Sequence, residues 1–139
     1  MLASRTVLLV IFAATPILST ANGFVYAALY ACDPVRFTST FVVACSSNHP
    51  RMAAQLDSAF EAWKFRNDLA SQKSAKSCVA EMRRRATSED QFREMTALMK
   101  RTEIESDDAS KKLAESAEWC AQILEGLQTG RLDVDSALK

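Results

Sequence analysis

Residues that break helices are almost absent from this chain after residue 23, and this scarcity restricts its possible folds more than any other feature. Only Pro34, Pro50, Gly126 and Gly130 occur there. The rest is rich in Ala, Glu, Lys, Arg, Gln and Met, which are favourable helix formers. The sequence therefore predicts an all-α protein, which we expect to be a small up-and-down bundle of four to five helices.

Residues 45–67 show the helical pattern most clearly. Pro50 suits the first turn of a helix, and Asn48 or His49 can cap it. Apolar side chains then recur at three- and four-residue spacing, which defines one face of a helix. We expect this stretch to be the central helix, with Trp63 in the core. The apolar residues of its predicted stripe are Met52, Leu56, Ala59, Phe60 and Trp63.

The helices on either side of the central one follow from local signals. Asp33-Pro34 predicts a cap and a first turn. The β-branched run at 38–43 would favour a strand, but no second strand is predicted to pair with it. The apolar pattern breaks near Ser71–Ser74, so we expect a separate third helix to end at Arg83–Arg85.

Two further helices are predicted in the C-terminal half. Ser88-Glu89-Asp90-Gln91 resembles a capping box that opens a fourth helix. The acidic residues at 103–108 predict a turn and then the start of a fifth helix, because carboxylates suit the positive end of a helix dipole. Gly130 is expected to end that fifth helix in a left-handed conformation.

The N-terminus has the order of a secretory signal peptide. Arg5 precedes the apolar run VLLVIFAATPIL, and the small and polar residues STANG follow. Cleavage after Ala21 or Gly23 would fit. We therefore divide the chain into a signal peptide at 1–23 and a helical domain at 24–139, exported to the periplasm or secreted.

Two alternatives for this segment stay open. Uncharged sequence continues to Cys32, and about 20 apolar residues can span a bilayer, so residues 6–31 could form an uncleaved inner-membrane anchor. Leu29-Tyr30-Ala31-Cys32 also resembles a lipoprotein cleavage site, although lipidation of Cys32 would leave an odd number of cysteines.

The four cysteines predict two disulfides, because an even set in a small exported domain forms a disulfide framework. If residues 34–45 are helical, Cys32 and Cys45 lie about 18 Å apart, whereas a disulfide needs Cα atoms within about 7 Å. In an up-and-down arrangement Cys78 returns to the level of Cys32, and Cys120 reaches Cys45. We predict Cys32–Cys78 and Cys45–Cys120, provided that the second and third helices are separate. In one long rod Cys78 would overshoot Cys32.

The order of cysteine, proline and an amphipathic run ending in Trp-x-x-Arg-Asn resembles a pattern in small exported bacterial proteins of unknown function. The matching residues cover about a sixth of the chain, and they are Cys45, Pro50, Leu56, Trp63, Arg66 and Asn67. The resemblance implies export and a helical fold, and it transfers no activity.

No catalytic, cofactor-binding or metal-binding arrangement is recognisable. The only histidine, His49, has no nucleophile to activate and no CxxC pair to complete a zinc site, so we expect a turn residue. Lys and Arg total 17, as do Asp and Glu, so no net field attracts nucleic acid. We expect no enzymatic activity and no cofactor.

The remaining interpretation is a protein that binds another macromolecule, most simply another protein. Because stripe residues are needed for the core, its binding face should lie on polar helix edges. The candidate partner-binding residues are Arg66, Asn67, Arg84 and Arg85. The alternative is a membrane-anchored accessory or scaffold component held by an uncleaved N-terminal helix.

Overall fold

The computed structural model describes residues 29–137, and every regular element within that range is a helix. The predicted signal peptide, and nearly all of the alternative anchor at 6–31, lie outside the described residues. The all-α prediction is confirmed, and the β-branched run at 38–43 is helical. After a helical turn at 29–32, the elements are α3 (Pro34–Asn48), the 3-10 helix η1 (Pro50–Met52), α4 (Ala53–Arg85), α5 (Glu89–Leu113), α6 (Ala117–Thr129) and α7 (Val134–Ala137).

The helix ends follow the local signals of the sequence closely. An Asp33 carboxylate oxygen accepts a hydrogen bond from the backbone N–H of Arg36 at 3.0 Å, and the Ser88 hydroxyl accepts one from Gln91 at 3.1 Å. Gly130 ends α6 with a φ of 80°, a conformation that glycine adopts without strain. These three predicted caps are confirmed.

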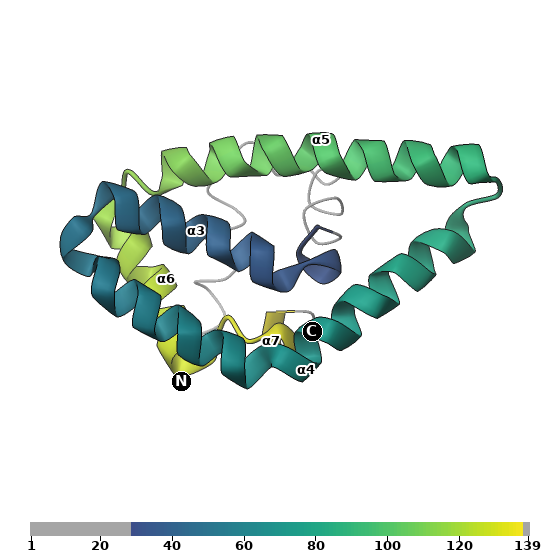
Figure 1. Ribbon diagram of the computed structural model, residues 1–139. Coiled ribbons are helices and arrows are strands. Elements are labelled where there is room, and N and C mark those ends of the chain that lie inside the picture. The colour runs from purple at the N-terminus through teal and green to yellow at the C-terminus, as the bar shows by residue number, and fades with distance from the viewer. Residues whose placement is uncertain (1–28, 138–139) are drawn as a thin grey trace, which may run out of the picture.

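The predicted break near Ser71–Ser74 is wrong, because α4 continues without interruption from Ala53 to Arg85. The serines remain helical, since Ser71 is buried and the Ser74 hydroxyl donates to the carbonyl of Ala31 at 2.6 Å. The apolar pattern stops there because α4 leaves the core, whereas the helix itself goes on. Figure 1 shows α4 changing direction near its middle.

The predicted turn at 103–108 is also wrong, because α5 runs through it to Leu113. Three small polar residues, Thr102, Ser106 and Ser110, take the buried positions of this part of α5 at four-residue spacing. The true turn follows at 114–116, where the Ser116 hydroxyl accepts from the backbone N–H of Trp119. Acidic residues inside the helix were therefore mistaken for its start.

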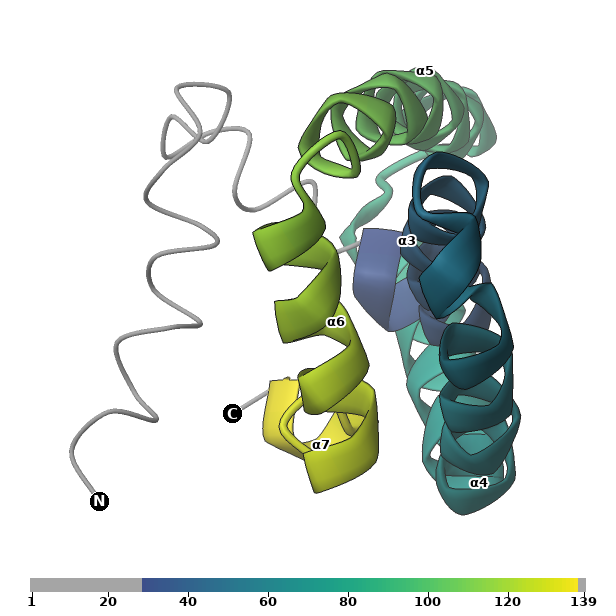
Figure 2. The same ribbon diagram turned by 90° about the vertical axis from the view of Figure 1, so that its left-hand side faces the viewer.

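The apolar core lies at one end of the molecule, where α3, the first half of α4, α6 and α7 meet. Edge-to-face ring contacts connect Tyr30, Phe37, Phe41 and Trp119, with successive centroids 5.6, 5.0 and 5.4 Å apart. Figure 2 shows α6 and α7 beside α3 and α4. The buried apolar residues are Val42, Ala44, Cys45, Leu56, Ala59, Trp63, Ala114, Trp119, Cys120, Ile123, Leu127 and Val134.

The second half of α4 and the first half of α5 form a hairpin that extends away from this core. Figure 1 shows the two helices converging at residues 86–88, well beyond the start of α3. No residue from 72 to 101 is buried. Near the tip, the Arg83 guanidinium lies 4.3 Å from the centroid of the Phe92 ring, a cation–π contact between the helices. We call residues 72–101 the distal hairpin.

Both predicted disulfides are confirmed, although the chain reaches them by a different path. The Cα atoms are 5.0 Å apart in Cys32–Cys78 and 5.6 Å apart in Cys45–Cys120. Because α4 changes direction, its second half meets the residues before α3, and Cys78 does not overshoot Cys32. Cys120 lies in the first turn of α6, since the long α5 has already returned the chain to Cys45.

Candidate partner-binding cleft

The Trp-x-x-Arg-Asn pattern of α4 holds the C-terminal segment of the described chain. The buried Trp63 donates from Nε1 to the carbonyl of Leu132 at 2.8 Å. Arg66 donates from Nε and Nη2 to the two carboxylate oxygens of Asp133 at 3.0 and 2.8 Å, and Nη2 also donates to the carbonyl of Leu127 at 2.8 Å. Such two-pronged charged pairs have a well-defined geometry.

Asn67 completes this arrangement from inside the protein. Its Nδ2 donates to Asp133 Oδ1 at 3.0 Å and to the carbonyl of Trp63 at 2.9 Å, and its Oδ1 accepts from the backbone N–H of Val134 at 2.9 Å. With only 3% of its surface exposed, Asn67 cannot contribute to a partner-contact surface, which corrects its assignment as a candidate. Arg66 is partly exposed, but its guanidinium is engaged within the chain.

The contacts within this cluster shift the pKa values of its titratable groups. The hydrogen bond from Arg66, with a further one from Asn67, holds the pKa of the Asp133 carboxyl below its usual value. The same pair raises the pKa of Arg66. Burial, together with the nearby Asp133 charge, raises the pKa of Tyr30 to about 12. The cluster therefore carries a fixed ion pair and a neutral phenol.

The other two candidates, Arg84 and Arg85, lie on the surface at the end of α4. Both donate to the carboxylate of Glu81, at 2.6 and 2.7 Å. The hydrogen bonds from Arg84 and then Arg85 lower the pKa of Glu81 to about 2. Arg84 and Arg85 follow Arg66 by 18 and 19 residues on the continuous helix α4, about five turns away, so the three arginines do not form one site.

His49 connects two turns at the core end of the molecule. Its Nε2 lies 2.8 Å from the carbonyl oxygen of Ala114, in the turn between α5 and α6. Because a carbonyl only accepts, Nε2 must carry the hydrogen. His49 therefore lies in a turn, as predicted, and joins the turn after α3 to the one after α5. The predicted cap is wrong, because neither Asn48 nor His49 caps the helix that follows, and the Asn48 amide donates back to the carbonyl of Ala44 at 2.9 Å.

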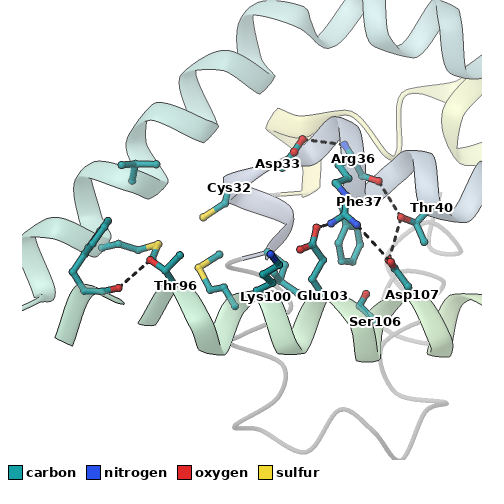
Figure 3. Close-up of a pocket in the computed structure, with 15 residues that line it drawn as sticks. Cys32, Asp33, Arg36, Phe37, Thr40, Thr96, Lys100, Glu103, Ser106 and Asp107 are labelled. Atoms are coloured by element: carbon teal, nitrogen blue, oxygen red, sulfur yellow. Dashed lines mark hydrogen bonds and ion pairs between the residues drawn. The ribbon is translucent and has the colours of Figure 1, made fainter. Parts of the chain in front are cut away.

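A cleft of about 440 Å³ lies between the start of α3, the second half of α4 and α5. Figure 3 shows its lining residues, which come from three segments that are distant in sequence. The apolar side chains are Leu29, Phe37, Val79, Met82, Phe92 and Met99. Methionine adapts its shape readily to a bound surface. These apolar residues are therefore suited to contact apolar side chains of varied shape in a binding partner.

Charged side chains from the start of α3 and from α5 also line the cleft, and they are already held in place by one another. Arg36 forms ion pairs with Glu103 and with Asp107, and Asp107 also accepts a hydrogen bond from the Thr40 hydroxyl at 3.4 Å. Figure 3 shows these side chains converging along one side of the cleft, with Lys100 beside them. Five charged residues line the cleft, namely Asp33, Arg36, Lys100, Glu103 and Asp107. Three carboxylates thus face two cations.

The sequence did not identify this cleft. Its apolar residues on α4 and α5 fit helical stripes, which ordinarily pack in a core, but Val79 is 49% exposed and Met82, Phe92 and Met99 are half-buried. One pattern in the sequence does point to it: apolar residues recur at helical spacing on both sides of the turn at 86–88, and no further apolar stretch nearby in the sequence could cover them. Nothing in the sequence around Arg36 predicts its place in the cleft.

Within residues 29–137, no three His, Cys, Asp or Glu side chains come together as metal ligands would. None of the helices described there combines the length and apolar character needed to cross a bilayer. Comparison with protein-family models, with curated proteins and with solved structures finds no match for this chain.

Proposed function

We propose that this chain is an exported, non-catalytic protein that binds a segment of another protein in the cleft between α3, α4 and α5. One observation carries the proposal. A hairpin without a buried residue from 72 to 101 presents half-buried Met and Phe side chains to a cleft of about 440 Å³. Exposed apolar surface of this kind is typical of protein-binding sites.

The lining defines the chemistry of the bound segment. Apolar side chains of the partner would contact Met82, Phe92 and Met99, as anchors enter a groove. The lining of the cleft also includes three carboxylates but only two cations, so a Lys or Arg of the partner next to those anchors would be favoured. We therefore expect an apolar segment flanked by a basic residue.

Two disulfides within the described residues support export. They close loops of 46 and 75 residues, and structural disulfides persist in oxidising compartments such as the periplasm. The alternative, an accessory protein anchored by residues 6–31, predicts a different mature species. The intact mass of the protein from the cell envelope, with and without reduction, distinguishes them. A start after Ala21 or Gly23 supports export by cleavage, and a full-length mass supports the anchor. A lipid-bearing mass that starts at Cys32 supports the lipoprotein alternative.

Site-specific photocrosslinking tests the cleft. A photoreactive amino acid in place of Met99, which lines the cleft, should trap a partner, whereas the same group at the exposed Ala97 should not. The crosslinked fragment should be an apolar segment with a basic residue. A synthetic peptide of that sequence should bind the purified protein and bind Met99→Glu at least tenfold more weakly. Equal crosslinking from both positions, or peptide binding unaffected by Met99→Glu, would overturn the proposal.

A further inference from the structure

The outer face of α4 carries two large apolar side chains with almost no cover. Phe65 is 89% exposed and Leu69 is 81% exposed, although the helix around them is well packed on its other side. They are four residues apart, so they are neighbours on the helix surface. Buried Trp63 and Asn67 point to the opposite side, into the core. These two apolar residues therefore contribute nothing to the fold described above.

The charges around this pair change sign along the helix. Glu61 lies four residues before Phe65, and Lys73 lies four residues after Leu69. Glu61, Phe65, Leu69 and Lys73 thus form one ridge in regular four-residue steps, and we call it the α4 ridge. Asp57 adds a further negative charge before it, and Lys76 adds a further positive charge after it.

We propose that the α4 ridge is a homodimer interface, in which α4 of two copies pack antiparallel about a two-fold axis between Phe65 and Leu69. In this register Phe65 meets the partner's Leu69, and Glu61 lies at the same level as the partner's Lys73, where their opposite charges attract without direct contact. Symmetry repeats both pairs, since an interface of this kind uses the same patch twice. The ridge is therefore complementary to itself in both shape and charge.

The surroundings of the ridge favour a second copy over other occupants. Ala54, Ser58 and Ala62 lie on the same exposed face, and their small side chains allow two helices to approach closely. An anionic bilayer would attract Lys73 and Lys76 but repel Asp57 and Glu61. An antiparallel copy matches both halves of the ridge.

The ridge also remains available in the folded chain. The carboxylate of Glu61 forms an ion pair with Lys64 at 2.5 Å, and the Glu61 side chain stays 70% exposed, so it can accept a second partner. The ridge faces away from the core, because Phe65 and Leu69 are exposed whereas Trp63 and Asn67 on the other side of α4 are buried, and Figure 1 shows that α4 bends around that core. Contact is then concentrated near Phe65 and Leu69, and we expect a weak dimer on the order of micromolar affinity.

Charge reversal provides a test that other partners would not satisfy. Sedimentation velocity of the purified disulfide-bonded protein should show a monomer–dimer equilibrium that weakens with salt. Glu61→Lys and Lys73→Glu should each raise the dimer dissociation constant by about tenfold or more, because each reversal opposes like charges at two symmetric positions. The double variant should restore the dimer, and mixing the two single variants should give a one-to-one heterodimer.

Controls keep this test specific. Glu105→Lys, on the exposed surface of α5, should leave the equilibrium unchanged. Phe65→Ser combined with Leu69→Ser should abolish the dimer without loss of helical circular dichroism, since neither side chain is buried. A wild-type protein that stays monomeric at the highest concentration reached would overturn the proposal. So would a double variant that dimerises no better than the single ones, or binding to anionic vesicles by a strictly monomeric protein.

Discussion

Asn67 joins α4 to the segment before α7 from inside the protein, beside the bonds that Trp63 and Arg66 make to the same segment. Its side-chain amide donates to Asp133 and to the carbonyl of Trp63, and it accepts from the backbone N–H of Val134. Asn67→Ala would leave the N–H of Val134 without a partner in a buried site, where an unsatisfied group costs about 1–3 kcal/mol, and would remove one hydrogen bond from Asp133. We expect the free energy of unfolding, measured in urea, to fall by about 2–3 kcal/mol.

A matched control separates this effect from the general effect of a shorter side chain. Gln55→Ala lies on the exposed face of the same helix and should change stability by less than about 0.5 kcal/mol. If both substitutions had equal effects, the bonds of Asn67 would contribute nothing to stability.

Asp133 makes the stability of the protein depend on pH. Its pKa is lowered in the folded state by the hydrogen bonds from Arg66 and Asn67. Its contribution is therefore fully present above the unfolded aspartate pKa, about 3.9, and is lost as the pH falls through the lower folded value. Asp133→Asn should destabilise the protein at neutral pH, and its difference from the wild type should shrink below about pH 4.

Urea unfolding of both proteins at a series of pH values measures this difference. Glu81, whose pKa is also lowered, to about 2, is present in both proteins and cancels in the comparison. A constant difference between the two proteins across the acid range would contradict the role of Asp133.

Among the elements, the unbroken α4 makes the sharpest prediction. Gln72→Pro falls in the middle of α4 and should destabilise the protein by about 3 kcal/mol or more, because proline removes a helical hydrogen bond and clashes with the preceding turn. Glu89→Pro places proline in the first turn of α5, after an extended Ser88, where it is well tolerated. Thermal unfolding by circular dichroism should show a large loss for the first and little change for the second. Tolerance of Gln72→Pro would indicate a loop at that position.

The ends of the helices could be predicted from the sequence much better than their continuity. Asp33, Ser88 and Gly130 act on their own backbone, so their signals are local. The break near Ser71–Ser74 is predicted from the loss of an apolar stripe, and that loss shows where α4 leaves the core. The turn at 103–108 is predicted from clustered acidic residues, but these lie inside α5, where Ser106 and Ser110 take the buried positions. The helix continues in both cases.

The candidate site was harder to predict because it depends on contacts between residues that are distant in the sequence. Polar residues on a helix edge, such as Arg66 and Asn67, predict an exposed binding face, but their partners at 127–134 lie more than 60 residues away in the sequence. The cleft depends on where α4 bends and where α5 returns. Neither is encoded by the spacing of residues within one helix.

At the scale of the whole molecule, we expect the two disulfides to stabilise different regions, one the core and the other the distal hairpin. Cys45–Cys120 joins buried residues of the core, whereas Cys32–Cys78 joins the start of the described chain to the distal hairpin. In the chain-entropy model each contributes about 4 kcal/mol. Replacing Cys32 and Cys78 by Ala should raise amide hydrogen exchange mainly in residues 72–101. Replacing Cys45 and Cys120 by Ala should raise exchange throughout the core.

Mass spectrometry of exchanged and digested protein measures both patterns. An equal rise over all helices in both variants would show that the core and the distal hairpin unfold as one unit. A rise in exchange confined to residues 72–101 after replacement of Cys32 and Cys78 would show that the cleft can open while the core stays folded.

The pairing of the cysteines also determines when each disulfide can form while the chain is being synthesised. Cys32 and Cys45 emerge first, yet neither is the partner of the other, and Cys120 follows Cys45 by 75 residues. At about 5–20 residues per second, that interval lasts several seconds. Trp63, Arg66 and Asn67 also wait for residues 127–134, which are made more than 60 residues later. A newly made chain can therefore close a non-native Cys32–Cys45 bond before its core exists, and that bond would have to be exchanged before both native pairs can form.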